Sequence, residues 1–148
     1  MIVADEYLAL LQLVDQAPRQ VGSETLALTY SRAYRLTRAL LDPGPGRLAV
    51  RGRFNRLVDA LSAADQAVLH DRLAEPDPSV LVVVDPRPTI RTAAAIQNTY
   101  ALSLLQAETI AAAVIHDWRI RFAEPDSASR SFRQAANELG LDLKIVGS

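Results

Sequence analysis

The segment at residues 102–124, LSLLQAETIAAAVIHDWRIRFAE, constrains the fold of this chain more than any other. Its first part has the leucine- and alanine-rich composition of a helix, and RIRFAE has the length and apolar content of a short strand. Helices that alternate with such strands are typical of α/β proteins, in which helical crossovers join parallel strands. This segment therefore predicts one helix–strand unit of a parallel sheet.

The rest of the chain repeats this alternation. It predicts a three-layer α/β/α sandwich with a mostly parallel sheet of four or five strands, and SVLVVV at 79–84 is expected to be a central strand covered on both faces. Ser23 is a good N-cap for a long helix that reaches Leu41. The expected strands are 2–4, 79–84, 119–124 and 141–146, and the expected helices are 6–16, 23–41, 53–61, 62–75, 88–99, 103–117 and a last one from 126 or 127 to 139.

Composition limits the classes of protein that this chain can join. The 148 residues, 49% of them hydrophobic, suit one globular domain over residues 1–148. The absence of cysteine excludes a disulfide, a thiolate zinc site and a cysteine nucleophile. No apolar run approaches the roughly 20 residues of a membrane span, and Asp5, Glu6 and Asp15 are unlike a signal peptide. We therefore expect a cytoplasmic protein, and its arginine- and alanine-rich composition suggests a bacterial one.

Acidic residues follow the expected strands. Asp5, Asp85 and Glu124 lie at strand ends, where open α/β sheets hold their ligands, and Glu108 lies near the start of a helix. Oxygen ligands of this kind suit Mg²⁺ or Mn²⁺, which can activate water against a phosphodiester. We consider Asp5, Glu108 and Glu124 as catalytic and metal-binding residues, with Asp126 as a further metal ligand. The alternatives are a dipole-stabilising Glu108, a solvated Glu124 before proline and a helix-capping Asp126.

A run of seven arginines between residues 32 and 56 is the second candidate, with Asp42 as the one acid among them. Clustered arginines suit contacts with a phosphate backbone, and neighbouring aromatic side chains could stack on bases. A solvated surface or an acidic protein partner would explain the same residues. The predicted nucleic-acid contacts are Arg35, Arg38, Arg51, Arg53 and Arg56.

Both ends of the chain resemble the PIN domains, the metal-dependent ribonuclease fold common among bacterial toxin–antitoxin toxins. The start MIVADEYLALLQLV is similar to their first strand and helix. The region from LVVVDPRPTIRTAAAIQ through residues 102–124 to ELGLDLKIV is similar to their ending. The resemblance covers both termini and about the last 70 residues. It implies the α/β/α fold, a cluster of acids that binds Mg²⁺ or Mn²⁺, RNA as substrate and an antitoxin protein as partner.

Carried over position by position, the resemblance implies only part of that acid cluster. The first metal acid falls on Asp5, and the last falls on Glu124, which is longer than the family's aspartate. The helix acid falls on Ala107, which leaves Glu108 one residue, about 100°, out of phase. The second acid falls near Tyr30 or Ser31, neither of which is an anionic ligand.

These departures favour a degenerate active site. The first hypothesis is a catalytically degraded PIN-like module that binds nucleic acid or a partner protein in a toxin–antitoxin-like context. The second is an active Mg²⁺- or Mn²⁺-dependent endoribonuclease that uses Asp5, Glu108 and Glu124. The third is a homodimeric interaction module that does not bind nucleic acid.

Overall fold

The computed structural model describes residues 1–41 and 53–147, and its centre is a parallel five-stranded sheet with the strand order β3-β2-β1-β4-β5. Every neighbouring pair of strands is parallel, so all carboxyl ends meet at one edge. The strands are β1 (Ile2–Ala4), β2 (Leu26–Leu28), β3 (Leu81–Val83), β4 (Arg119–Phe122) and β5 (Leu143–Ile145). The α-helices are α1 (Glu6–Leu13), α2 (Tyr30–Leu41), α3 (Arg53–Ala60), α4 (Ala63–Ala74), α5 (Ile90–Thr99), α6 (Leu104–His116) and α7 (Arg130–Glu138), and the 3₁₀ turns are η1 (Arg19–Val21), η3 (Arg87–Thr89) and η4 (Pro125–Ser127).

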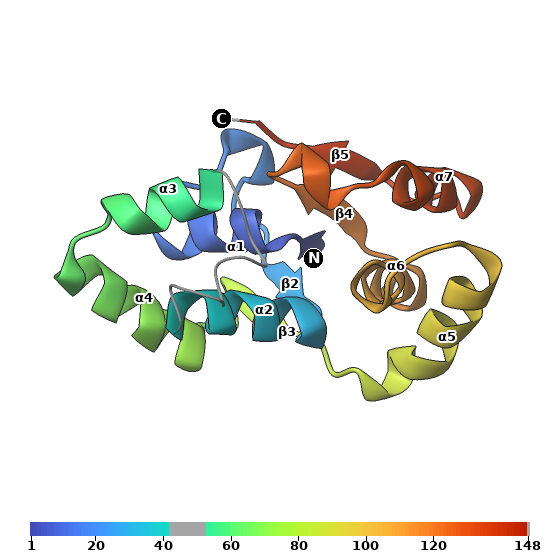
Figure 1. Ribbon diagram of the computed structural model, residues 1–148, viewed down its shortest axis with the longest axis horizontal. Helices are drawn as coiled ribbons and strands as arrows, with labels where there is room; N and C mark the ends of the chain where they lie inside the picture. The colour runs from blue at the N-terminus through green and yellow to red at the C-terminus, as the bar shows by residue number, and fades with distance from the viewer. Residues whose placement is uncertain (42–52, 148) are drawn as a thin grey trace.

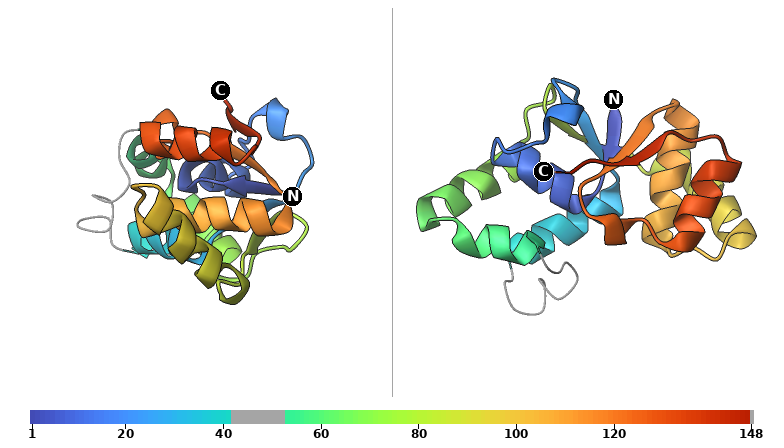
Figure 2. Two further views of the ribbon diagram at one scale, coloured as in Figure 1. Left: turned by 90° about the vertical axis from the view of Figure 1, so that its right-hand side faces the viewer. Right: turned by 90° about the horizontal axis from the view of Figure 1, so that it is seen from above.

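The sheet separates two groups of helices, which confirms the predicted three-layer α/β/α architecture (Figure 1). Ile2 and Ala4 of β1 pack with α1–α4, whereas Val3 between them packs with α5, α6 and α7. This alternation follows from the two-residue period of a strand. The left view of Figure 2 faces α5, α6 and α7. The right view shows the two helical groups at opposite ends of the molecule.

The prediction of a single long helix over 23–41 is wrong. Leu26, Ala27 and Leu28 form β2, which pairs with β1 on one side and β3 on the other, and α2 begins only at Tyr30. All three strand residues are fully buried, so the sheet outweighs the helical preference of leucine and alanine. The shorter helix determines where the arginines of α2 lie.

The prediction that SVLVVV is a central strand is also wrong. Only Leu81–Val83 form β3, and β3 lies at the edge of the sheet beside β2. Val83 is 45% exposed, although its sequence context suggested cover on both faces. No helix in the two described ranges is long and apolar enough to cross a membrane.

The remaining predicted elements are confirmed with shifts of a few residues. Ser62 caps α4 by accepting a hydrogen bond from the Asp65 amide, and Gly140 ends α7 with a φ of 70°. The last helix begins later than expected. Residues 125–127 form η4, and Ser129 then caps α7 by accepting from the amide of Phe132.

Loss of the Asp142 carboxylate is expected to lower stability by about 1 kcal/mol at neutral pH, because the buried Arg121 guanidinium loses a partially exposed partner. Arg121 Nη2 donates to Asp142 Oδ2 at 2.9 Å, and this contact holds the pKa of Asp142 below its ordinary 3.8. A lowered carboxyl pKa contributes stability above pH 3.8 that disappears as pH falls through the folded-state value. Asp142→Asn should therefore flatten stability against pH below 3.8 in urea titrations. If Asp142→Asn loses stability below pH 3.8 as steeply as the wild type does, this assignment is wrong.

Candidate functional site

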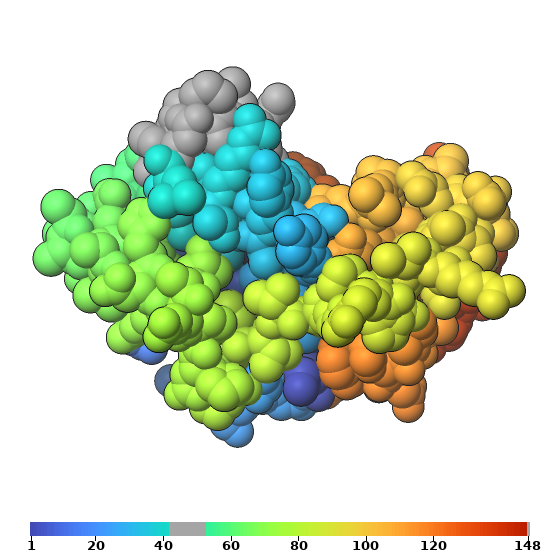
Figure 3. All heavy atoms as spheres, turned by 90° about the horizontal axis from the view of Figure 1, so that it is seen from below, coloured from blue at the N-terminus to red at the C-terminus, as the bar shows by residue number. Residues whose placement is uncertain are grey.

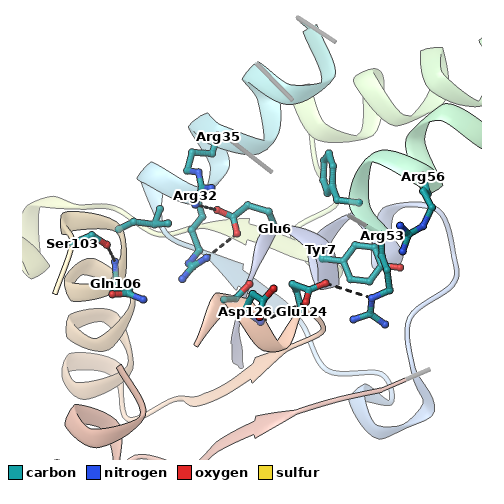
Figure 4. A pocket seen from close by; sticks show the side chains of 13 residues that line it. Glu6, Tyr7, Arg32, Arg35, Arg53, Arg56, Ser103, Gln106, Glu124 and Asp126 are labelled. Atoms are coloured by element: carbon teal, nitrogen blue, oxygen red, sulfur yellow. Dashed lines mark hydrogen bonds and ion pairs between the residues drawn. The ribbon is translucent and has the colours of Figure 1, made fainter. Parts of the chain in front are cut away.

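A cavity of about 610 Å³ opens at the carboxyl edge of the sheet (Figure 4). Its walls come from the starts of α1, α2, α3 and α6 and from η4 beyond β4. This is the position at which open α/β sheets hold their ligands. The lining residues are Glu6, Tyr7, Arg32, Arg35, Arg53, Phe54, Arg56, Ser103, Leu105, Gln106, Glu124, Asp126 and Ser127.

Asp5, the first predicted metal ligand, is a structural crosslink. Its fully buried carboxylate caps α1 through the Leu8 amide at 2.8 Å. It also accepts from the amides of Ala123 at 3.1 Å and Glu124 at 2.9 Å, and from Ser127 Oγ at 2.8 Å. A carboxylate offers about four lone-pair positions, so these four donors occupy them all. Asp5 therefore joins the end of β1 to the segment after β4.

The pKa of Asp5 is raised above its ordinary 3.8, and burial is the main cause. The hydrogen bonds from Glu124, Leu8, Ser127 and Ala123 act in the opposite direction because they stabilise the ionised form. A metal at Asp5 would have to displace at least one of these donors. That cost disfavours Asp5 as a ligand.

Glu108 is engaged with α2. Its Oε1 accepts from the Ser31 amide at 3.0 Å and its Oε2 accepts from Ser31 Oγ at 2.7 Å. Glu108 thus stabilises the positive end of the α2 dipole. It is not among the residues that line the cavity. Its partner Ser31 is one of the two positions where the resemblance would place another acid.

A buried ion pair lies at the cavity floor. Arg32 is 1% exposed, and its Nη1 donates to Glu6 Oε2 at 2.7 Å while its Nε donates to Thr109 Oγ1 at 2.8 Å. Arg35 Nη1 donates to the other Glu6 oxygen at 3.0 Å. The Arg32 guanidinium also lies 4.9 Å from the centroid of the Phe122 ring, within cation–π range. Two arginines that share one carboxylate thus leave a net positive charge at this edge of the sheet.

The remaining Arg32 nitrogen, Nη2, is buried and has no hydrogen-bond partner among the described residues. Figure 4 shows the guanidinium reaching into the region between Gln106 of α6 and Asp126 of η4. An unmet buried donor costs about 1–3 kcal/mol, and more when it is charged. This N–H group therefore lacks an acceptor among the described residues.

Glu124 is partly buried and contacts Arg53 of α3. Its Oε2 accepts from Arg53 Nε at 3.4 Å, and its Oε1 receives the amide of Asp126 at 3.5 Å. Arg53 also donates to the Ala123 carbonyl and lies 4.9 Å from the Tyr7 ring centroid. Asp126 is exposed, and its side chain lines the cavity from η4.

Three of the four acids suggested as ligands for Mg²⁺ or Mn²⁺ are engaged within the protein, and the fourth, Asp126, is exposed. In residues 1–41 and 53–147, no group of three or more histidine, aspartate or glutamate side chains is placed to hold a metal. Asp5, Glu108 and Glu124 each have hydrogen-bonding partners of their own. Mg²⁺ needs near-octahedral oxygen ligands and loses its water reluctantly, so carboxylates already committed to donors are poor ligands. Asp85 is likewise paired: Arg87 Nη2 donates to Asp85 Oδ2 at 2.6 Å, and this hydrogen bond lowers the pKa of Asp85 to about 2.

The structure brings part of the predicted arginine set together. Arg35, Arg53 and Arg56 line the cavity, whereas Arg38 is exposed on α2 and is not among the lining residues. Arg51 lies outside the described residues.

Sequence reasoning did not select Glu6 or Arg32. Glu6 follows Asp5 directly, and its side chain would have been found by asking which acid in α1 could meet the arginines of α2. Arg32 is in the arginine run, but its burial depends on α2 starting at Tyr30.

No protein-family model matches this chain, and a search of curated proteins found no match. The likeness to PIN domains therefore rests on the two quoted ends of the sequence. Its implications for activity, metal and partners remain predictions.

Proposed function

We propose that this chain is a PIN-like module that binds single-stranded RNA through its phosphates, in the cavity at the carboxyl edge of the sheet, and does not cleave the strand. The observation that carries the proposal is a cavity lined by four arginines and three acids, in which Glu6 and Glu124 are paired with arginines and one net positive charge is left. The cavity arginines are Arg32, Arg35, Arg53 and Arg56.

Guanidinium groups suit this role because their planar forks match phosphate oxygens. Arg53 and Arg56 lie on α3 and reach the cavity mouth, where Arg56 is exposed. Tyr7 also lines the cavity, and the Arg53 guanidinium lies over its ring, 4.9 Å from the centroid. Electrostatic contacts of this kind bind single strands with little sequence preference.

Binding of a short single-stranded RNA should weaken when Arg53 and Arg56 are both replaced by glutamine. Each lost phosphate contact should reduce the slope of log affinity against log salt concentration by about 0.7. Fluorescence anisotropy at several salt concentrations, with the RNA labelled at one end, would measure both effects.

The matched control removes two positive charges that lie outside the cavity lining. Arg19 of η1 and Lys144 of β5 are exposed and do not line the cavity, so Arg19→Gln with Lys144→Gln should keep the wild-type affinity and slope. If both double variants lose RNA affinity to the same extent, the change in net charge alone explains the effect. Undetectable binding of the wild type at low salt would reject the proposal and favour a protein partner.

The metal-dependent ribonuclease is tested in the same samples. We expect the RNA to stay intact with Mg²⁺ or Mn²⁺, and its affinity to be the same in EDTA. Cleavage that requires the metal and disappears in Asp126→Ala, a variant of an exposed cavity residue, would reinstate the enzyme hypothesis.

Self-association is a second candidate, because one face of α2 carries exposed apolar side chains. Tyr30 is 57%, Tyr34 59% and Leu41 70% exposed, and their spacing places them on one stripe. Figure 3 shows α2 exposed along this face of the molecule. Light scattering at micromolar concentration should detect a dimer that Tyr34→Ser weakens, and a strict monomer would remove this candidate. An antitoxin-like protein is the other partner that this surface would suit in a bacterial cytoplasm.

A further inference from the structure

The unpartnered N–H of Arg32 identifies the chemical group that the cavity takes. We infer that the cavity seats a terminal phosphate, a phosphate monoester at the end of an RNA strand or on a single nucleotide, with Arg32 Nη2 as the innermost donor. This inference rests on the proposed RNA binding and names the part of the ligand that the site recognises.

The donor is built into the fold. Arg32 Nε is held by Thr109 Oγ1, which in turn donates to the Leu105 carbonyl at 3.0 Å, and Nη1 is held by Glu6. Because Nε and Nη1 are both held, the planar guanidinium fixes the direction of the Nη2 N–H groups. Arg32 is 1% exposed and lines the cavity, so its guanidinium belongs to the buried wall and not to an open surface.

An anionic oxygen is the acceptor that suits this donor best. Hydrogen bonds from a guanidinium to a charged oxygen are about twice as strong as those between neutral groups. Polar side chains that line the same cavity could meet further phosphate oxygens. Gln106 and Ser103 come from α6 and its cap, and Arg56 comes from α3 (Figure 4).

The depth of Arg32 favours a terminal phosphate over an internal one. An internal phosphodiester carries a sugar on both sides, so both chain directions would have to leave the floor of the cavity. A monoester has one ester bond, which can point to the mouth, and three free oxygens for the donors. A cavity of about 610 Å³ lies within the usual range for small-ligand sites, roughly 300–1,000 Å³.

The test compares RNAs of one sequence with a 5′-phosphate, a 3′-phosphate or hydroxyl groups at both ends, all binding the wild-type protein. At least one phosphorylated strand should bind roughly tenfold tighter than the hydroxyl strand. Competition with a nucleoside 5′-monophosphate against the matching nucleoside, and with inorganic phosphate, distinguishes a strand end from a free nucleotide or ion.

Two variants locate the phosphate. Arg32→Lys keeps the charge but removes the fork. Gln106→Ala removes a half-buried cavity side chain together with one hydrogen bond, from Gln106 Nε2 to Ser129 Oγ at 2.9 Å, so we expect this variant to fold. Both should reduce the preference for the phosphorylated strand, and the second keeps the test valid if the first does not fold.

The outcomes separate the two proposals. If all three strands bind equally, the terminal-phosphate seat is wrong while RNA binding stands. If none binds, the proposed function fails first. A preference that survives both variants would place the phosphate elsewhere and overturn the role of Arg32.

Discussion

Asp5→Ala is expected to lower the free energy of unfolding by about 3–5 kcal/mol, because it leaves buried donors unmet and removes a helix cap. Three of the four donors are backbone amides, which cannot turn away to find water. The loss should be the same in EDTA and in Mg²⁺, because Asp5 acts as a crosslink between β1 and the segment after β4. Urea denaturation followed by circular dichroism would measure it.

This result separates a crosslink from a metal ligand. Acids gathered for a metal repel one another without it, so removal of one would then preserve or raise stability in EDTA. Asp126→Ala is the matched control, since that carboxylate is exposed on η4 and its loss should change stability by less than about 0.5 kcal/mol. The crosslink would be contradicted if Mg²⁺ raised the stability of the wild type and Asp5→Ala were as stable as the wild type in EDTA.

Glu6→Gln is expected to cost about 3–5 kcal/mol as well, because it leaves the Arg32 guanidinium buried without its counter-charge. Glu6 is the shared acceptor of Arg32 and Arg35, with side-chain exposures of 6%, 1% and 31%. The change is isosteric, so loss of charge and not of volume would cause the effect. In urea denaturation, a lower midpoint with an unchanged dependence of the unfolding free energy on urea concentration would establish this loss of stability.

The double variant Glu6→Leu with Arg32→Met provides the control. Apolar replacement of both partners of a buried ion pair is often neutral or stabilising, so this protein should be markedly more stable than Glu6→Gln. It should also lose any preference for a terminal phosphate, because Nη2 is gone. If the stability loss of the double variant equals the sum of the losses of its two single variants, Glu6 and Arg32 are not energetically coupled.

The sequence predicted the architecture because hydrophobic periodicity reports burial locally. The segment at 102–124 became α6 and β4 within two residues of expectation, and the acids after β1 and β4 lie at the predicted edge. The two errors have one cause. Leu26–Leu28 and Leu81–Val83 are too short for their own composition to distinguish helix from strand or edge from centre.

The candidate site was less predictable than the fold. Sequence reasoning named residues that could bind a metal, but a carboxylate shows its role only through its neighbours. Asp5 meets Ala123 and Glu124, more than 115 positions away, and Glu108 meets Ser31, 77 positions away. No spacing rule reports such pairings.

By itself, the sequence determined a parallel α/β sheet, its polar edge and a group of arginines near it, because these depend on local patterns of polarity. Only the tertiary structure decided what the charges do there. It placed Arg32 against Glu6 and enclosed Asp5 among four donors. The energy of a charge depends on burial and on partners brought close by folding, and those distances are absent from the order of residues.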